Sequence, residues 1–323
     1  MTAVSLLAMT AASPALAQAA GFSLIEAPDP PGEALPVGVW YPADAPAANH
    51  RLGLYNQVVA PDAAVDGRSH PLIVMSHGNG GSMDGHYDTA LALAHAGFIV
   101  AAMTHSGDNY RDQSRATQLA DRPRAVHAVI DTMLTTWPGH AAIDADRIGV
   151  FGYSAGGFTA LVSVGGVPDL ARVAPYCAAH EATYVCQLLK RHPVGAAGPV
   201  PMRAWIADRR IKAAVVAAPA IGFTFAPDGL RNVPVPVQLW RAEDDHVLPA
   251  PDYAEAVRDA LPRPPEYHVV PGADHFDFLA PCTEALAGVA PTICQERGGF
   301  DRAAFHQTFN QEVVRFFEQV LRR

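Results

Sequence analysis

The hydrophobic positions along the chain form short continuous runs separated by longer segments of helical periodicity. Three runs, LIVMS, FIVAAM and AAVVAA, contain almost no polar residue. Such runs are typical of parallel strands that are buried on both faces. The pattern predicts strands at Leu35–Tyr41, Pro71–Ser76, Phe98–Thr104, Ile148–Gly152, Ile211–Ala217, Val235–Trp240 and Glu266–Val270.

Helical periodicity fills the segments between these runs. In Arg124–Thr135 the apolar residues recur at spacings of three and four, which places them on one helix face. We also expect helices over residues 83–96, Asp252–Leu261 and Asp301–Leu321. Alternating strands and helices predict an α/β fold with a mostly parallel, doubly wound sheet, in which Leu35–Tyr41 is part of an antiparallel edge. Ligands bind such sheets outside the carboxyl ends of the strands.

Residues 167–210 interrupt the alternation. They show no strand pattern and contain five prolines, so we expect an irregular insertion over one end of the sheet. It either covers the ligand site and selects substrate or forms a surface loop. Because no repeat or long linker divides the remainder, we expect a single domain over residues 21–323.

Composition excludes several classes of function. Half of the residues are hydrophobic, 17% are charged and the net charge is −9, as in an ordinary folded protein. Only two of the 23 basic residues are Lys and no basic patch is evident, which argues against binding to nucleic acid. Beyond the N-terminus no apolar run is long enough to span a bilayer. We therefore expect no nucleic-acid partner and no stable membrane insertion, and composition alone names no activity.

The N-terminus resembles a secretory signal. An apolar run and a small-x-small triplet occupy residues 1–17, with cleavage expected near Ala17 or Ala19. No Lys or Arg precedes the apolar run, and the first basic residue is Arg51. Either the signal is atypical or the true start lies upstream. We expect a periplasmic or secreted protein, against the alternative of a frayed helix in a cytosolic one.

The four cysteines favour the same compartment. Cys177 lies close to Cys186, and Cys282 lies close to Cys294, so we expect each neighbouring pair to form a disulfide. The alternative is four reduced, buried thiols in a cytosolic enzyme. A zinc site is not expected, because the chain contains neither C-x-x-C nor H-E-x-x-H.

The clearest chemical motif is Gly152-Tyr153-Ser154-Ala155-Gly156, which is G-x-S-x-G. It stands between a predicted strand and the helical pattern FTALVSV, the context in which a sharp turn lifts a nucleophilic serine out of the sheet. Glycines that merely end a strand and open a helix are the alternative. We expect Ser154 to be the nucleophile.

A second glycine-rich turn, HGNGGS, follows the strand Pro71–Ser76. Backbone N–H groups at such a strand end can stabilise an oxyanion. We assign the oxyanion hole to the N–H groups of Asn79 and Ala155. A phosphate-binding loop is the alternative, but no Walker lysine follows the glycines.

A serine nucleophile needs a histidine base. If the acid precedes the base along the chain, only His246, His268, His275 and His306 remain as candidates after the strand Val235–Trp240. His268 lies inside the last predicted strand, His306 lies inside the last helix, and His246 adjoins the candidate acid. His275, just after the last strand, is the expected base.

The acid is expected at the end of the preceding strand, where the sequence offers three adjacent carboxylates. We favour Asp245, three residues after the small residue Ala242, and Asp244 is the runner-up. Asp274 and Asp277 flank the base, and we expect them to be solvated or to cap the following segment.

These motifs together resemble the α/β-hydrolases. The chain is more narrowly similar to bacterial predicted dienelactone hydrolases, which are akin to platelet-activating-factor acetylhydrolase. The resemblance covers almost everything after the first 36 residues. It rests on VGVWYPA, PLIVMSHGNGGS, GFIVAAMTHSGDN, VFGYSAGGF, RIKAAVVAAPA, RAEDDHVLP and HFDFLAPC.

The resemblance implies a hydrolase of short or oxidised acyl esters that uses Ser154, Asp245 and His275 and needs no cofactor or metal. True dienelactone hydrolases carry a Cys nucleophile where this chain has Ser154, so lactone opening is not implied. We expect a serine esterase that forms an acyl-enzyme. The alternatives are a polyester or lipid acyl hydrolase, an acyltransferase, and a non-catalytic binding protein of the same fold.

Overall fold

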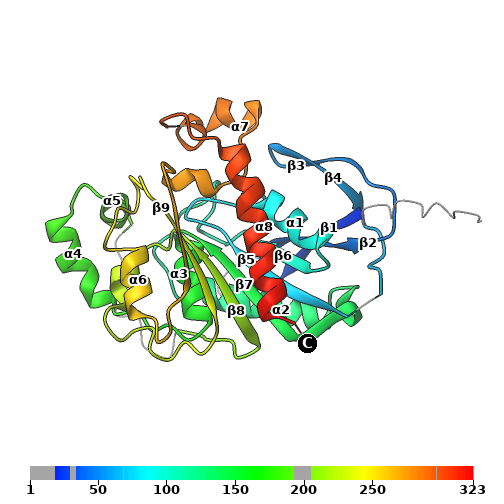
Figure 1. Ribbon diagram of the computed structural model, residues 1–323, viewed down its shortest axis with the longest axis horizontal. Helices are drawn as coiled ribbons and strands as arrows, with labels where there is room; N and C mark the ends of the chain where they lie inside the picture. The colour runs from blue at the N-terminus through cyan, green and yellow to red at the C-terminus, as the bar shows by residue number, and fades with distance from the viewer. Residues whose placement is uncertain (1–18, 30–33, 68, 193–204, 296, 323) are drawn as a thin grey trace, which may run out of the picture.

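The computed structural model describes residues 19–29, 34–67, 69–192, 205–295 and 297–322. Ten strands form one sheet in the order β10-β9-β8-β7-β5-β6-β2-β1-β4-β3 (Figure 1). Their bounds are β1 Ala19–Ala27, β2 Leu35–Ala43, β3 Ala48–Leu52, β4 Tyr55–Pro61, β5 His70–Ser76, β6 Ile99–Met103, β7 Ile143–Tyr153, β8 Ile211–Ala217, β9 Val237–Ala242 and β10 Glu266–Val270.

Six neighbouring strands of the sheet are parallel, namely β10, β9, β8, β7, β5 and β6, which confirms the predicted doubly wound sheet. All residues of β5 and β6 are buried, as their continuous apolar runs indicate. Because the strands are parallel, their carboxyl ends lie at one edge of the sheet. The segments that follow β5, β7, β9 and β10 therefore converge there.

The strand predicted at Leu35–Tyr41 is β2. Its predicted antiparallel pairing is confirmed, because β2 is antiparallel to both β6 and β1. The sheet nevertheless continues beyond it through β1, β4 and β3, which the hydrophobic pattern did not reveal. In β4 the polar residue Gln57 is buried, where its Oε1 accepts the indole N–H of Trp40 at 2.7 Å, while Val58 is 55% exposed. In this strand a polar side chain is buried and an apolar one is exposed, so the hydrophobic pattern does not show which face of the strand is buried.

Helices cover both faces of the sheet (Figure 1). Helices α1 and α8 pack on one face and α2, α3 and α6 on the other, so the core consists of two apolar layers. Asp301 is the N-cap of helix α8, and its carboxylate accepts the N–H of Ala304 at 2.9 Å. The bounds are α1 Tyr87–His95, α2 Asp121–Thr135, α3 Ala155–Ser163, α4 Val173–Ala179, α5 Tyr184–Arg191, α6 Ala254–Ala260, α7 Glu284–Val289 and α8 Arg302–Val320.

The described part of the insertion contains no strand, in agreement with the sequence pattern, but it is more regular than expected. It contains α4 and α5, and residues 193–204 lie outside the described residues. Both expected disulfides are present. Cys177 in α4 is bonded to Cys186 in α5, and Cys282 before α7 is bonded to Cys294.

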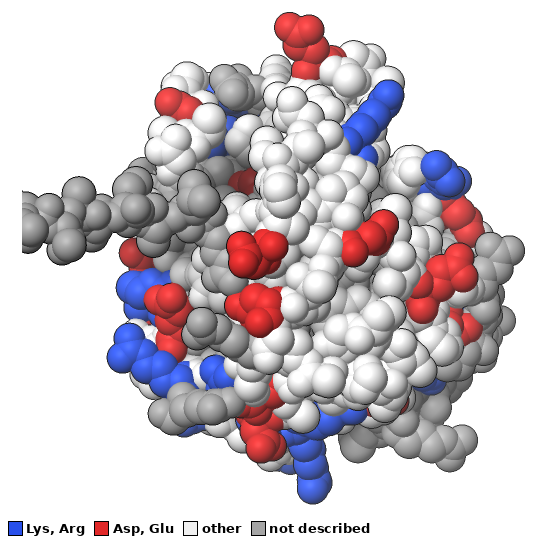
Figure 2. All heavy atoms as spheres, turned by 90° about the vertical axis from the view of Figure 1, so that its right-hand side faces the viewer, with Lys and Arg blue, Asp and Glu red and all other residues white. Residues whose placement is uncertain are grey.

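The expected signal segment, residues 1–17, lies outside the described residues. Within the described part of the chain, no helix combines the length and apolar character needed to cross a membrane. On the face shown in Figure 2, Lys and Arg lie at separate places around the rim and do not gather into one patch.

Candidate active site

Glycines on both sides of Ser154 make its sharp turn possible. Ser154 lies between β7 and α3 with φ 55° and ψ −116°, a strained conformation of the kind G-x-S-x-G turns use to expose the side chain. A Cβ atom on Gly152 would lie 2.0 Å from the carbonyl oxygen of Gly156, and one on Gly156 would lie 1.8 Å from that of Ser76. Only glycine fits at these two positions. The predicted strand and helix flanks of the motif are confirmed.

Ser154, His275 and Asp245 lie in one hydrogen-bonded chain. The Oγ of Ser154 is 3.1 Å from Nε2 of His275, and Nδ1 of His275 is 2.8 Å from Oδ2 of Asp245. His275 and Asp245 are buried, whereas the runner-up acid Asp244 is exposed. The second oxygen of Asp245 accepts the backbone N–H groups two and three residues later, at 3.0 and 2.6 Å. An imidazole that donates Nδ1–H to Asp245 presents its Nε2 lone pair to Ser154.

The two aspartates beside His275 hold backbone and do not contact its ring. Asp274 accepts the N–H groups of His275 at 2.7 Å and of His246 at 3.0 Å, so it joins the loop that carries His275 to the loop that carries Asp245. Asp277 accepts the N–H of Asp274 at 2.8 Å and completes a capping box. Both carboxylates are buried. The expected capping role is confirmed, and the expected alternative of solvated side chains is wrong.

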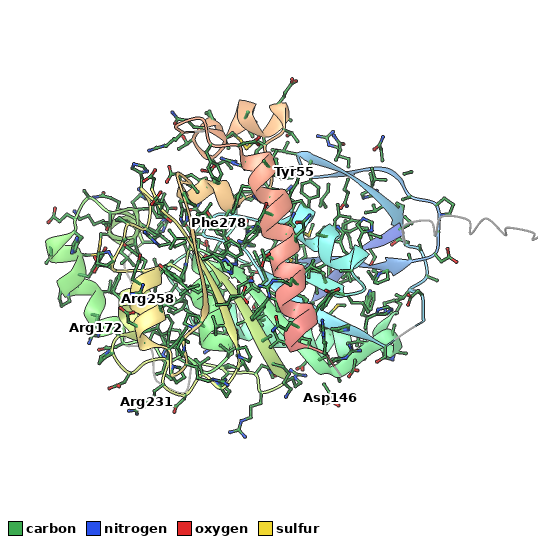
Figure 3. The ribbon with its side chains drawn as sticks, viewed as in Figure 1. Tyr55, Asp146, Arg172, Arg231, Arg258 and Phe278 are labelled. Atoms are coloured by element: carbon green, nitrogen blue, oxygen red, sulfur yellow. A yellow bond between two sulfur atoms is a disulfide. The ribbon has the colours of Figure 1, made fainter. Side chains whose placement is uncertain are left out.

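Two further side chains brace the turn that carries His275. The hydroxyl of Tyr153 donates to the carbonyl oxygen of His275 at 3.0 Å, and burial raises the pKa of Tyr153 well above its usual value, so this donor stays protonated. Arg302 forms a buried ion pair with Asp277 at 3.0 Å and also contacts the sulfur of Cys282 at 3.3 Å. The second disulfide is therefore joined to the His275 turn through Arg302. Phe278, at the end of this turn, packs against α8 (Figure 3).

A buried ion pair supports the HGNGGS turn. The carboxylate of Asp108 accepts the side-chain amide of Asn79 at 2.6 Å and the N–H of Gly80 at 3.0 Å. Arg122, on α2, donates to the same carboxylate and to the backbone oxygen of His77. Because Asp108 and Arg122 are both buried, charge-assisted hydrogen bonds from the protein interior hold the turn in place.

The two expected oxyanion donors lie beside Ser154. Asn79, Ser154 and Ala155 all line one pocket. Ala155 is the first residue of α3, where a backbone N–H has no acceptor within the helix and the helix dipole is positive. The position of the Ala155 N–H therefore suits an anion.

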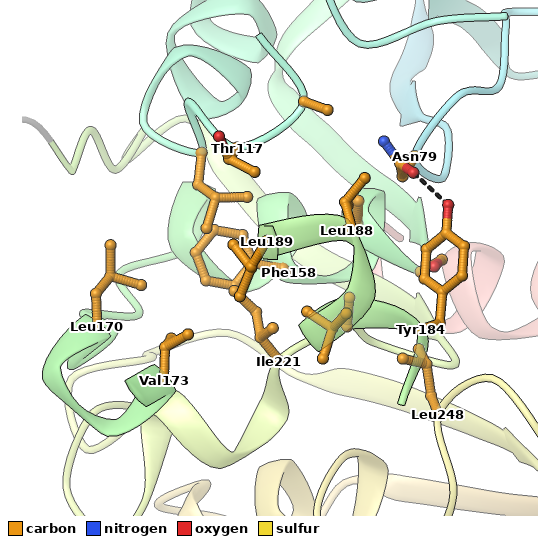
Figure 4. Close-up of a pocket in the computed structure, with 16 residues that line it drawn as sticks. Asn79, Thr117, Phe158, Leu170, Val173, Tyr184, Leu188, Leu189, Ile221 and Leu248 are labelled. Carbon is orange, nitrogen blue, oxygen red and sulfur yellow. Dashed lines mark hydrogen bonds between the residues drawn. The ribbon is translucent and has the colours of Figure 1, made fainter. Parts of the chain in front are cut away.

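The pocket beside Ser154 is almost entirely apolar (Figure 4). Phe158 comes from α3, Leu188 comes from α5 in the insertion, and Ile221 and Leu248 follow β8 and β9. None of the described residues that line it is charged. The described part of the insertion thus forms one wall of this pocket, which favours the first of its two expected roles.

Histidines buried near the HGNGGS turn predict a pH-dependent stability. Burial, and then the charge of Arg122, lower the pKa of His77 to about 4, and the same causes lower that of His105. Burial also lowers the pKa of His86 to about 3. Below the ordinary value of 6.5 the unfolded chain therefore binds more protons than the folded protein. We expect the free energy of unfolding to fall between about pH 6.5 and pH 4, by up to about 1.4 kcal/mol per pH unit for each histidine.

Urea unfolding at a series of pH values measures this dependence. The slope of the free energy of unfolding against pH shows how many buried histidines contribute. His105→Gln removes one buried titrating ring, so the slope decreases by up to about 1.4 kcal/mol per pH unit whatever the absolute stability of the variant. His140→Gln makes the same change at an exposed ring and is the control. Equal slopes in wild type and His105→Gln would contradict this prediction.

Among the described residues, one grouping has the ligand types and spacing of a metal site, namely Glu266, His268 and Glu312. Glu266 already accepts hydrogen bonds from Gln238, Arg315 and His268 through one oxygen. The grouping lies on β10 and α8, and none of its members lines the pocket beside Ser154. We assign it no part in the chemistry at Ser154.

The sequence patterns did not reveal the roles of Asp108, Arg122 and Tyr153 in this site. A signal existed for Asp108, because it follows the strand β6 and loops after parallel strands meet at the carboxyl edge of the sheet. Arg122 was marked only by its place at the start of an otherwise apolar helix face. Tyr184 lies in the insertion, for which covering the site was one of the two expected roles, but its contact with Asn79 had no sequence signal.

No family model matches the chain, and no curated protein matches it in sequence. Among solved structures, a ferulic acid esterase from Streptomyces cinnamoneus matches with a TM-score of 0.66 and 19% identity, covering 96% of this chain and 92% of that one. A likeness at this level of identity concerns the fold. Together with the parallel sheet and the strained turn at Ser154, it shows that this chain has the α/β-hydrolase fold.

Proposed function

We propose that the protein is a serine hydrolase that cleaves carboxylic esters. The observation that carries the proposal is the hydrogen-bonded chain of Ser154, His275 and Asp245 at the carboxyl edge of the sheet. A serine hydroxyl becomes a strong nucleophile when a positioned imidazole takes its proton, and the imidazole in turn needs an orienting carboxylate. The structural likeness to an esterase supports the same class of reaction.

In the first half of the reaction, Oγ of Ser154 attacks the ester carbonyl carbon while Nε2 of His275 takes the hydroxyl proton. Asp245 stabilises the imidazolium that forms. The N–H groups of Asn79 and Ala155 bind the oxyanion, and donors of this kind are each worth about 3–4 kcal/mol in the transition state. His275 then gives its proton to the departing alkoxide, which leaves as the alcohol.

In the second half, water takes the place of the alcohol. His275 removes a proton from the water, the resulting hydroxide attacks the acyl carbon, and the bond to Oγ of Ser154 breaks. The carboxylic acid leaves and the serine hydroxyl is restored by the proton on His275. Every proton in this sequence is held by residues of the chain or by the substrate, so the proposed reaction needs no cofactor and no metal ion.

The substrates that we propose are small esters with short acyl groups. The motifs that resemble dienelactone hydrolases and platelet-activating-factor acetylhydrolase imply such esters, and that narrower family remains a prediction from the sequence. The uncharged, apolar pocket beside Ser154 supports an apolar acyl group. A polyester or lipid acyl hydrolase would use the same three residues, so only the pocket distinguishes these functions.

We further propose that a single domain over residues 21–323 is exported to the periplasm or secreted. The two disulfides support this, because disulfides persist in oxidising compartments. Strand β1 begins at Ala19 and pairs with β2 from its first residue. Cleavage after Ala17 would therefore leave the sheet whole, whereas cleavage after Ala19 would remove one paired residue.

A panel of esters tests the proposed function. We expect the full chain to hydrolyse p-nitrophenyl acetate and butyrate, with EDTA leaving the rate unchanged, and to hydrolyse a phospholipid and an aliphatic polyester far more slowly. Loss of activity in EDTA would contradict the proposed mechanism. The absence of turnover on every ester would instead favour a non-catalytic binding protein.

A further inference from the structure

The described insertion forms a cap that is fastened to the body of the protein. Helices α4 and α5 are joined by the Cys177–Cys186 disulfide. The ring of Tyr176 in α4 stacks on Phe223 with centroids 3.9 Å apart, and its hydroxyl donates to the hydroxyl of Tyr253 at 3.1 Å. We use the term cap for residues 170–191. These contacts place its second helix, α5, beside Ser154.

Tyr184, the first residue of α5, connects the cap directly to the HGNGGS turn. Its hydroxyl donates to Oδ1 of Asn79 at 2.5 Å (Figure 4). The other end of the same amide donates to Asp108 at 2.6 Å. Both ends of the Asn79 side chain are therefore held, one by the cap and one by the core. The backbone N–H that we assign to the oxyanion hole belongs to this residue.

The position of the pocket indicates which half of an ester it holds. Ser154, Asn79 and Ala155 line it, but His275 does not. In the proposed reaction His275 gives a proton to the departing alkoxide, so the alcohol half must lie on the side of Ser154 that faces His275. Because Ser154 and the two residues of the assigned oxyanion hole line the pocket and His275 does not, we assign the acyl half to this pocket.

The size and lining of the pocket limit the acyl group. The volume open to the centre of a water molecule is about 60 Å³, which corresponds to only about four water molecules. No charged side chain is among the described lining residues, so an acyl group that carried a carboxylate would lose its hydration without gaining a partner. A slender, uncharged acyl chain of a few carbons fits these limits.

We propose that α5 determines acyl specificity, with Leu188 limiting chain length and Tyr184 acting as a positioning residue for Asn79. The substrate class is esters of short, uncharged, unbranched aliphatic acids. This inference rests on the proposed function, because it assumes acyl transfer to Ser154. Leu188 is a buried residue that lines the pocket, and its side chain therefore occupies space that a longer acyl chain would need.

Leu188→Ala tests the limit on chain length. We expect the ratio of kcat/KM for p-nitrophenyl octanoate to that for the acetate to rise at least about tenfold, because the space left by the Leu188 side chain buries further methylenes of the longer acyl chain. Leu286→Ala is the matched control. Leu286 is buried to the same degree, at 8% exposure against 7% for Leu188, and it also lies in a short helix beside a disulfide, but not at the pocket. We expect its ratio to equal that of the wild type.

Three outcomes separate the possibilities. If the wild type hydrolyses esters but Leu188→Ala leaves the acyl ratio unchanged, this inference is overturned and the proposed function stands. If Leu188→Ala instead changes the preference within a series of acetate esters of different alcohols, the pocket holds the alcohol half and the inference is also overturned. If the wild type hydrolyses no ester, the proposed function itself fails. Should Leu188→Ala not fold, Leu188→Phe replaces it. This variant must lower the ratio of kcat/KM for the octanoate to that for the acetate, and an unchanged ratio overturns the inference.

Tyr184→Phe tests the positioning role, because it removes the hydroxyl and keeps the ring at the pocket wall. We expect kcat for p-nitrophenyl acetate to fall about fivefold with KM unchanged, as for one lost neutral hydrogen bond. Tyr176→Phe is the control for cap attachment, since it keeps the stacked ring and removes a cap hydroxyl that bonds to Tyr253 and not to Asn79, and we expect a smaller loss of kcat than in Tyr184→Phe. A rise in KM alone, or an equal loss in both variants, would show that Tyr184 only holds the cap.

Discussion

Replacing Asp245 with Asn is expected to lower kcat by about 10⁴-fold, the loss that serine hydrolases with this arrangement show when the acid becomes an amide. The amide can donate to Nδ1 of His275, which moves the imidazole proton to Nε2, the atom that faces Ser154 at 3.1 Å. The base is then in the wrong tautomer to accept the serine proton. The amide oxygen can still accept the two backbone N–H groups that Asp245 now binds, so the loop keeps its shape. Initial rates with p-nitrophenyl acetate measure the loss.

Asp244→Asn is the matched control, because it makes the same chemical change one residue earlier. Asp244 is exposed, and its contact with Ala273 at 2.9 Å uses its backbone N–H. We expect kcat within about twofold of the wild type, as for an ordinary surface substitution. Equal losses in the two variants, or a loss in Asp244→Asn alone, would contradict the choice of Asp245.

Ser154→Ala is expected to have the larger effect, a loss of about 10⁵- to 10⁶-fold in kcat, because acyl transfer to the enzyme can no longer occur. The residual rate would come from binding and from the oxyanion donors. Ser163→Ala serves as the control, since it removes a buried hydroxyl from the other end of α3 that donates to the carbonyl oxygen of Thr159 at 2.8 Å. Stopped-flow and long-incubation assays cover this range of rates. A Ser154→Ala protein that kept a tenth of wild-type activity would exclude Ser154 as the nucleophile.

The central parallel strands β5 and β6 were predictable because burial on both faces leaves few polar positions in them. Strands β8 and β10 have the bounds that the pattern predicted, and the other parallel strands differ by a few residues at their ends. The extension through β1, β4 and β3 was not predictable in this way. In β4, Gln57 is buried and accepts a hydrogen bond from Trp40, whereas Val58 is exposed. A prediction from polarity would therefore place the exposed face of this strand on the wrong side.

The candidate site was predictable to the extent that local motifs and strand order define it. A G-x-S-x-G turn after one strand, and loops after the two last strands, must meet at the carboxyl edge of a parallel sheet, which is where Ser154, Asp245 and His275 lie together. The choice between Asp245 and Asp244 depended on a spacing rule, and burial now separates the two side chains.

The supporting contacts could not be predicted, because they join segments that are distant in sequence. Arg122 on α2 holds the turn after β5, and Tyr184 reaches Asn79 across 105 positions. Neither contact has a local signature. The sequence allowed the insertion to cover the site, but no local pattern identified α5 as the segment that lies against the pocket.

The identity of the nucleophile is the central claim, and covalent labelling tests it most directly. A fluorophosphonate transfers its phosphonyl group only to a serine activated by a neighbouring base, and peptide mapping by mass spectrometry then locates the adduct. We predict one adduct per chain, on the peptide that contains Ser154, and none in Ser154→Ala. An adduct on a different residue, or an unlabelled wild-type protein that is folded, would contradict the account.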